Sequence, residues 1–177
     1  MSAAERAEES EAVRQRAMEL PELLSAQSVM AFLPMPDELD TRPILSDLLR
    51  AGKRVYVPRT FVTEKRMIPV RLRDLDRLRV GEYNIAEPDG DEPCRPEEID
   101  FIFVPARAYD LHGNRLGRGA GFYDRFMASD GFRAVRCGIG FDCQLLDQVP
   151  HAPHDLPVHI VVTKSRIHRG GTTDDGY

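Results

Sequence analysis

The stretch DLHGNRLGRGAGFYDRF, residues 110–126, brings glycines, arginines and an aspartate together at close spacing. Glycine has no Cβ, so consecutive backbone N–H groups in such a loop can turn toward one anion. Arg115 and Arg118 add forked donors that suit phosphate oxygens. Asp124 lies early in an expected helix, where its carboxylate could hold a magnesium ion that phosphate oxygens also coordinate. These residue types predict a site for a polyphosphate together with its metal.

Two established phosphate-binding motifs do not match this loop. A Walker A sequence requires a lysine after its glycines, and none follows here. The dinucleotide pattern G-x-G-x-x-G would place a glycine at position 122, where the chain has Phe122. From spacing alone, a glycine-rich turn with solvated arginines stays open as the alternative.

The elements that would position this loop alternate between strands and helices. Apolar runs bounded by proline or glycine predict strands at 28–35, 54–60, 66–72, 101–106, 134–142 and 159–164. Helix-forming segments predict helices at 2–20, 41–50 and 121–129. We expect Thr41 to cap the second helix, Pro58 to close the second strand and Pro69 to place the third strand at a sheet edge. Residues 81–98, rich in proline, glycine and acidic side chains, predict a long loop.

This alternation predicts an α/β protein with a three-layer, Rossmann-like fold, in which helices flank a largely parallel central sheet. The length of 177 residues favours one domain, residues 1–168, and the polar stretch 169–177 predicts a disordered tail. In such folds ligands bind beyond the carboxyl ends of the strands. The glycine-rich loop and the segments that follow 28–33 and 134–141 leave strands at that end. We therefore expect these three segments to meet at one edge of the sheet.

Composition and charge narrow the class of protein. No run approaches the roughly 18 apolar residues of a membrane span, and the acidic beginning MSAAERAEES lacks the order of a secretory signal. The formal net charge of −5 disfavours a general nucleic-acid binder. Cys94, Cys137 and Cys143 form no CxxC pair, which is typical of a reducing compartment. We expect a cytoplasmic protein without a membrane or nucleic-acid partner, either a monomer or a weak homodimer.

Residues 113–125, GNRLGRGAGFYDR, resemble the signature G-x-R-L-G-x-G-x-G-[YF]-Y-D-R of the 5-formyltetrahydrofolate cyclo-ligase family, also called methenyltetrahydrofolate synthetases. Other segments are similar to the family in the same order: FLPMPDELDT at 32–41, GKRVYVPR at 52–59, YNIAEPDG at 83–90, DFIFVPARAYD at 100–110 and GIGFDCQLLDQVPHAPHD at 138–155. The resemblance covers nearly the whole chain, from residue 3 to residue 165.

The resemblance implies an enzyme that uses ATP and Mg²⁺ to convert 5-formyltetrahydrofolate into 5,10-methenyltetrahydrofolate, with release of ADP and phosphate. Its expected catalytic residues are Arg118 and Tyr123. The ATP phosphates would be bound by Arg115, Leu116, Gly117, Arg118, Gly119, Ala120, Gly121, Phe122 and Tyr123. The folate substrate would contact Leu33, Glu38, Arg118, Gly119, Ala120, Gly121 and Phe122. The magnesium carboxylates would be Asp124 and Asp155.

Two alternatives stay open. Family members begin with a helix carrying K-x-x-[LI]-R, whose basic side chains reach the ATP, whereas the residues before the first expected strand include no lysine. A non-catalytic member that binds folate or a nucleotide is therefore the second hypothesis. His151 and His154 beside Asp155 suggest a zinc site. We disfavour it because no further soft ligand lies near them in the sequence.

Overall fold

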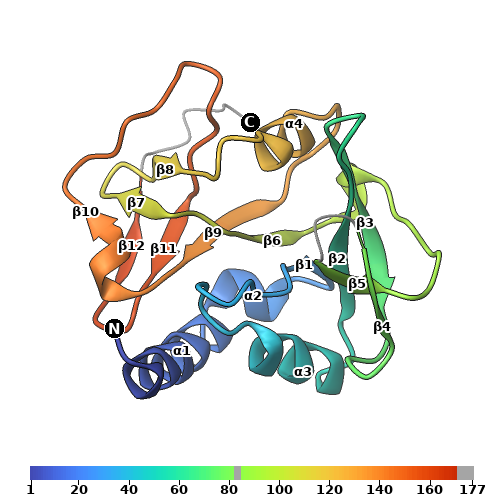
Figure 1. The fold of residues 1–177 in the computed structure, drawn as a ribbon, viewed down its shortest axis with the longest axis horizontal. Helices are drawn as coiled ribbons and strands as arrows, with labels where there is room; N and C mark the ends of the chain where they lie inside the picture. The colour runs from blue at the N-terminus through green and yellow to red at the C-terminus, as the bar shows by residue number, and fades with distance from the viewer. Residues whose placement is uncertain (82–84, 171–177) are drawn as a thin grey trace.

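A seven-stranded sheet forms the centre of the computed structural model, which describes residues 1–81 and 85–170 (Figure 1). The strand order is β12-β11-β9-β6-β1-β2-β3. The bounds are β1 Ser28–Met30, β2 Arg54–Phe61, β3 Arg66–Leu72, β6 Phe101–Val104, β9 Val135–Ile139, β11 Ile160–Val162 and β12 Ile167–Arg169. The inner strands run parallel, and β3 and β12 lie antiparallel at the edges. The largely parallel sheet and the edge position expected for residues 66–72 are confirmed.

Helices cover both faces of the sheet (Figure 1). On one face lie α1 (Ala3–Met18), α2 (Pro21–Ser25) and α3 (Arg42–Arg50), and on the other lies α4 (Phe122–Met127). Alternate side chains of β6 serve the two layers. Phe101 and Phe103 join the apolar cluster of α1–α3, whereas Ile102 and Val104 join that of α4. A strand buried on both faces requires this period of two, and the predicted three-layer arrangement is confirmed.

Two small sheets accompany the central one. β7 (Ala108–Asp110), β8 (Arg115–Leu116) and β10 (Leu145–Leu146) form the first, and β4 (Leu78–Val80) pairs with β5 (Ala86–Pro88) in the second. The prediction of a long loop at 81–98 is therefore wrong, although residues 82–84 lie outside the described part. Buried Glu87 explains the extra pairing, because its carboxylate lies 3.4 Å from Nε of Arg59 and 2.7 Å from Nη2 of Arg79.

Two expected boundary residues act differently in the structure. β2 continues through Pro58 to Phe61, because β1 already ends opposite Tyr56 and no parallel neighbour needs the N–H that proline lacks. Thr41 does occupy the N-cap position of α3, but its hydroxyl donates to the carbonyl of Phe32 at 2.6 Å and does not cap the helix. This buried bond ties the start of α3 to the segment that leaves β1.

The last strand, β12, is absent from the predicted set. It pairs with β11 through three residue pairs, Ile160 with Arg169 among them. The guanidinium of Arg169 also binds the carboxylate of Glu22 in α2 at 2.7 Å. Arg169 is the first residue of the expected tail, of which residues 171–177 lie outside the described part of the chain.

Tyr109, fully buried in β7, joins the carboxyl ends of two central strands. Its hydroxyl donates to the carbonyls of Val104, at 2.6 Å, and Ile139, at 3.3 Å. The ring lies against Gly138 in β9 and against Gly140, which follows β9. A Cβ would lie only 2.3 Å from the ring at Gly138 and 3.2 Å from it at Gly140. Glycine is required here because the aromatic ring occupies the space of a side chain.

We expect Gly138→Ala to lower the free energy of unfolding by about 1–3 kcal/mol, because the added methyl group overlaps the Tyr109 ring in a packed core. The measurement is urea denaturation followed by circular dichroism. Gly90→Ala is the matched control, since a Cβ at Gly90 meets no atom within 4 Å. Equal denaturation midpoints for the two variants would contradict this account of the packing.

Candidate active site

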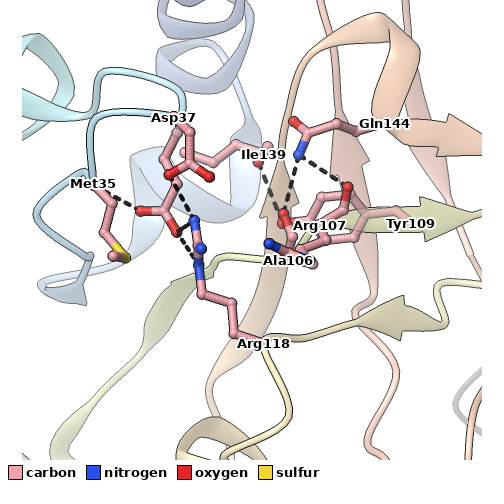
Figure 2. Close-up of polar contacts among 9 residues, drawn as sticks. Met35, Asp37, Ala106, Arg107, Tyr109, Arg118, Ile139 and Gln144 are labelled. Atoms are coloured by element: carbon pink, nitrogen blue, oxygen red, sulfur yellow. Dashed lines mark hydrogen bonds and ion pairs between the residues drawn. The ribbon is translucent and has the colours of Figure 1, made fainter.

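The parallel sheet changes direction between β1 and β6. From β1 the chain crosses to β2 on one side, and from β6 it crosses to β9 and β11 on the other. In open α/β sheets, ligands bind outside the carboxyl ends of the strands at such a switch point. β1 ends at Met30, earlier than the expected 28–35, so residues 31–41 leave the sheet beside this point. The loop at 117–121 reaches the same place from the β7–β8 hairpin (Figure 2).

The guanidinium of Arg118 joins these two loops (Figure 2). Nη2 donates to Oδ1 of Asp37 at 2.8 Å, and Nε donates to Oε1 of Glu38 at 3.3 Å. The second oxygen of Glu38 accepts the backbone N–H of Met35 at 2.9 Å, which fixes the carboxylate. The Arg118 hydrogen bond lowers the pKa of Asp37 below its usual value. Arg118 and Glu38, both predicted from the sequence, therefore meet, and Asp37 is a partner that the sequence prediction missed.

Tyr123 and Leu33 occupy less exposed positions near this pair. Burial raises the pKa of the Tyr123 phenol, and the nearby charge of Glu38 raises it further. The phenol therefore stays protonated at neutral pH, a form that can donate a hydrogen bond. Leu33 is 7% exposed and belongs to the apolar cluster on the α1–α3 face.

The glycine loop, residues 117–121, presents backbone N–H groups next to Arg118. Gly119 and Gly121 have positive φ angles, +91° and +67°, and Gly121 directly precedes α4. These values confirm the expected use of glycine, because other residues adopt such angles at a cost. Within the described residues, no hydrogen bond uses the backbone N–H groups of 118–121. The loop thus offers donors of the kind that an anion needs.

Asp110 holds the base of the hairpin that leads into this loop. Its buried carboxylate accepts the backbone N–H groups of His112, at 2.9 Å, and Asn114, at 3.0 Å. It also accepts Nδ2 of Asn114 at 3.0 Å and the backbone N–H of Val149 at 3.2 Å. Burial acts to raise the pKa of Asp110, but these hydrogen bonds outweigh it and lower the pKa overall. The turn closes at Gly113, whose φ is +83°.

Gln144, in the segment that follows β9, bonds to the segment that follows β6 (Figure 2). Its Nε2 donates to the carbonyls of Ala106 and Arg107, each at 3.1 Å, and its Oε1 accepts the N–H of Phe141 at 2.8 Å. The segment after β9 is therefore fixed against the segment after β6. The expectation that three loops meet at one edge of the sheet is confirmed.

Arg115 and Asp124 form an ion pair behind the glycine loop. Their side chains are only 4% and 16% exposed. Oδ1 of Asp124 also accepts the backbone N–H of Leu156 at 3.1 Å, so Asp155, the preceding residue, lies close by in the chain. Asp155 accepts the N–H of Ala152 at 2.7 Å. The backbone next to Asp155 thus contacts Asp124, and a guanidinium already neutralises one of the two predicted magnesium carboxylates.

The described residues include no group of three or more histidine, cysteine, aspartate or glutamate side chains arranged to hold a metal ion. His154 lies 3.7 Å from the Asp155 carboxylate, on an exposed loop. Over the same residues, no helix is long and apolar enough to cross a membrane.

The family model of the 5-formyltetrahydrofolate cyclo-ligases matches residues 1–164. The chain belongs to the 5-formyltetrahydrofolate cyclo-ligase family. The family identified from residues 113–125 is therefore confirmed.

Individual relatives of the cyclo-ligase family agree with this assignment. The chain is 33% identical over 156 residues to the 5-formyltetrahydrofolate cyclo-ligase of Escherichia coli K12, covering 86% of each protein. It is 36% identical over 150 residues to that of Mycolicibacterium smegmatis, covering 81% of this chain and 76% of the relative. The solution structure of 5,10-methenyltetrahydrofolate synthetase from Aquifex aeolicus superposes with a TM-score of 0.83 and 32% identity, covering 100% of this chain and 87% of the other.

The stability of this cyclo-ligase fold should depend on pH through Asp110. The folded-state pKa lies below the unfolded value of about 3.9. The stabilisation is therefore complete above that value and is lost as the pH falls through the folded-state pKa. We expect Asp110→Asn to lower the free energy of unfolding by about 2 kcal/mol at pH 7. This difference from the parent protein should shrink below about pH 4. Asp130→Asn, on an exposed side chain, is the control. A difference that stays constant from pH 7 to pH 3 would contradict the role of the carboxylate.

Removing one partner of the Arg115–Asp124 pair should be costly. Asp124→Ala leaves a buried guanidinium without its counter-charge, so we expect a loss of about 3–5 kcal/mol in the free energy of unfolding. Glu92→Ala, which removes the exposed partner of Arg73, should leave stability nearly unchanged. The measurement is urea denaturation of both variants.

The double variant Arg115→Met with Asp124→Leu distinguishes a lost charge from lost packing. It should recover most of the stability, because neither buried charge remains. If Asp124→Ala is no less stable than Glu92→Ala, the pair does not hold α4 in place.

Proposed function

We propose that this member of the cyclo-ligase family closes the ring of 5-formyltetrahydrofolate to 5,10-methenyltetrahydrofolate and converts ATP into ADP and phosphate. The observation that carries the proposal is the position of Arg118, held by Asp37 and Glu38 at the switch point of the sheet. ATP is the co-substrate of the family. The bare N–H groups of 118–121 beside this arginine suit its phosphates.

The chemistry requires an oxygen to leave the formyl carbon. The formyl oxygen attacks the γ-phosphorus of ATP, and the bond to ADP breaks. N10 then attacks the activated carbon, loses its proton, and phosphate leaves with the former formyl oxygen. The protein has to align three reacting groups and to neutralise charge on the transferring phosphoryl group.

Arg118 is the residue proposed to neutralise that charge. Its side chain is 37% exposed, so it can turn from the two carboxylates toward a bound phosphate. Glu38 is proposed to accept N–H groups of the pterin ring, as the family resemblance implies. A pterin bound to Glu38 would remove one partner of Arg118, and the phosphoryl oxygens would replace it. Tyr123 would donate its proton in a hydrogen bond and keep it.

The carboxylates of this site suit Mg²⁺, although each already has a partner within the protein. Carboxylate oxygens are hard ligands of the kind that Mg²⁺ prefers together with phosphate oxygens and water. Asp124, which accepts the Leu156 N–H, and Asp155, the residue before Leu156, are the side chains that would hold it. A bound Mg²⁺ would neutralise phosphate charge. Arg115 already forms an ion pair with Asp124, so the magnesium ion would share that carboxylate with a guanidinium.

The test measures methenyltetrahydrofolate by absorbance in a mixture of 5-formyltetrahydrofolate and Mg²⁺, with and without ATP. We expect ATP-dependent product from the parent protein. Arg118→Met should lower kcat by about 10²–10³-fold, as expected when one donor to a developing charge is lost. Arg118→Lys should keep part of the activity because it keeps the charge.

The matched control is Arg73→Met, which removes an exposed arginine paired with Glu92 outside the site. Its kcat should equal that of the parent. A folded parent protein that binds 5-formyltetrahydrofolate but forms no product would favour the non-catalytic binder. Full kcat in Arg118→Met would overturn the assigned role of this arginine.

A further inference from the structure

Arg125 of α4 binds the glycine loop by its backbone. Nη2 of the guanidinium donates to the carbonyl of Ala120, inside the loop, and Nε donates to the carbonyl of Lys65 at 2.7 Å. Its Cζ lies 5.6 Å from the ring centre of Phe122, in a cation–π arrangement. One side chain therefore joins the loop at 117–121 to the turn between β2 and β3, which lies beside α4 (Figure 1).

The turn between β2 and β3 is a well-defined anchor for this side chain. The two strands form seven residue pairs, of which Phe61 with Arg66 is the last before the turn. Lys65 has a φ of +50°, a conformation that costs free energy for a residue with a Cβ. The N–H of Lys65 donates to the carbonyl of Val62 at 3.0 Å, and its own carbonyl accepts Nε of Arg125. The turn thus presents a fixed carbonyl to the guanidinium.

The hydrogen bond to Ala120 sets the direction of the next N–H group. The carbonyl of Ala120 and the N–H of Gly121 belong to one peptide unit, and no peptide bond among the described residues is cis. In a planar trans peptide these two groups point in opposite directions. Because the carbonyl is directed at Arg125, the Gly121 N–H is directed away from that guanidinium. No atom of the described residues accepts this N–H, so it stays available to a ligand.

Gly121 is also the position at which the guanidinium approaches the backbone closely. A Cβ there would lie 3.0 Å from Nη1 of Arg125, and the φ of +67° disfavours any other residue. Gly119, the other glycine of the loop with a positive φ, would meet no atom within 4 Å if it had a Cβ. Gly119 therefore supplies backbone freedom alone, whereas Gly121 also leaves room for Arg125.

We propose that Arg125 is a positioning residue for the nucleotide, because its hold on the Ala120 carbonyl keeps the Gly121 N–H directed at the phosphates of ATP. The proposal rests on the proposed function, since ATP is the co-substrate of that reaction. A forked guanidinium binds two separate carbonyls at once, whereas an ammonium has a single nitrogen for both. The N–H is aligned before ATP binds, so binding does not have to order it.

The first experiment measures the order of the loop without a ligand. Protein labelled with ¹⁵N-glycine is observed by NMR, and the {¹H}–¹⁵N NOE reports motion of each glycine N–H on the ps–ns timescale. We expect Gly121 to be as ordered as Gly138 of the central sheet. Arg125→Met and Arg125→Lys should both lower the order of Gly121 and leave Gly138 unchanged. Arg125 is exposed, so both variants should unfold at the same urea concentration as the parent.

The second experiment measures kcat/KM for ATP and KM for 5-formyltetrahydrofolate with the same variants. Arg125→Met and Arg125→Lys should each lower kcat/KM for ATP about tenfold, the factor expected for one misaligned hydrogen bond. KM for 5-formyltetrahydrofolate should not change. Arg133→Met, which removes an exposed arginine before β9, is the matched control and should equal the parent in both measurements.

The outcomes separate the positioning role from the reaction. If Arg125→Lys equals the parent in kcat/KM for ATP, charge alone matters and the positioning role is overturned. Unchanged order of Gly121 in both variants overturns it as well. Lower order with unchanged kcat/KM for ATP overturns the role and leaves the proposed function standing.

A parent protein without turnover would overturn the proposed function, and binding of a non-hydrolysable ATP analogue with Mg²⁺ then decides the role of Arg125. The role is supported if Arg125→Met binds the analogue about tenfold more weakly than the parent. It is overturned if the parent does not bind the analogue, or if the two proteins bind it equally.

Discussion

The packing of the Tyr109 ring against Gly138 is the constraint from which the site takes its geometry. The phenol bonds to the carbonyls of Val104 and Ile139, the last residues of β6 and β9. Asp110, the next residue, binds the turn of the β7–β8 hairpin. The ring therefore fixes the first strand of the hairpin that leads into the glycine loop. A loop of flexible residues is placed accurately because its starting point is part of the core.

Two arginines of the glycine-rich stretch have the same chemistry and different roles. Arg115 is 4% exposed and paired with a buried carboxylate, so separating the pair would leave a charge without solvent or partner. Arg118 is 37% exposed, where an ion pair contributes little to stability and its partners can be exchanged. Burial thus gives Arg115 a carboxylate partner next to α4 and leaves Arg118 more accessible to a ligand. The assignment of both arginines to the ATP phosphates stays a prediction, and spacing along the chain carries no information on this difference in burial.

The apolar runs and the glycine pattern were enough to predict the α/β class, the parallel sheet and the meeting of three loops. They failed where long-range partners decide the outcome. Pro58 does not end β2, because its neighbour β1 is already over. β5 forms inside a polar segment because Glu87 meets Arg59, which is distant in sequence, and Arg79, its partner across the β4–β5 pair. Asp37 was missed beside Glu38 because the sequence does not show that the Arg118 side chain bonds to both of these adjacent carboxylates.

The carboxylates around the proposed active site have arginine partners before any ligand binds. Arg118 pairs with both Asp37 and Glu38, which leaves one net negative charge there, and Arg115 pairs with Asp124. A folate with N–H donors would give Glu38 a new partner, and a nucleotide with oxygens would give Arg118 one. Asp37, whose side chain is 64% exposed, would then be left to solvent, where an unpaired charge costs little. The ion pair between the loops after β1 and β8 is thus a resting arrangement that two substrates together can open at low cost, while either one alone leaves a partner unsatisfied.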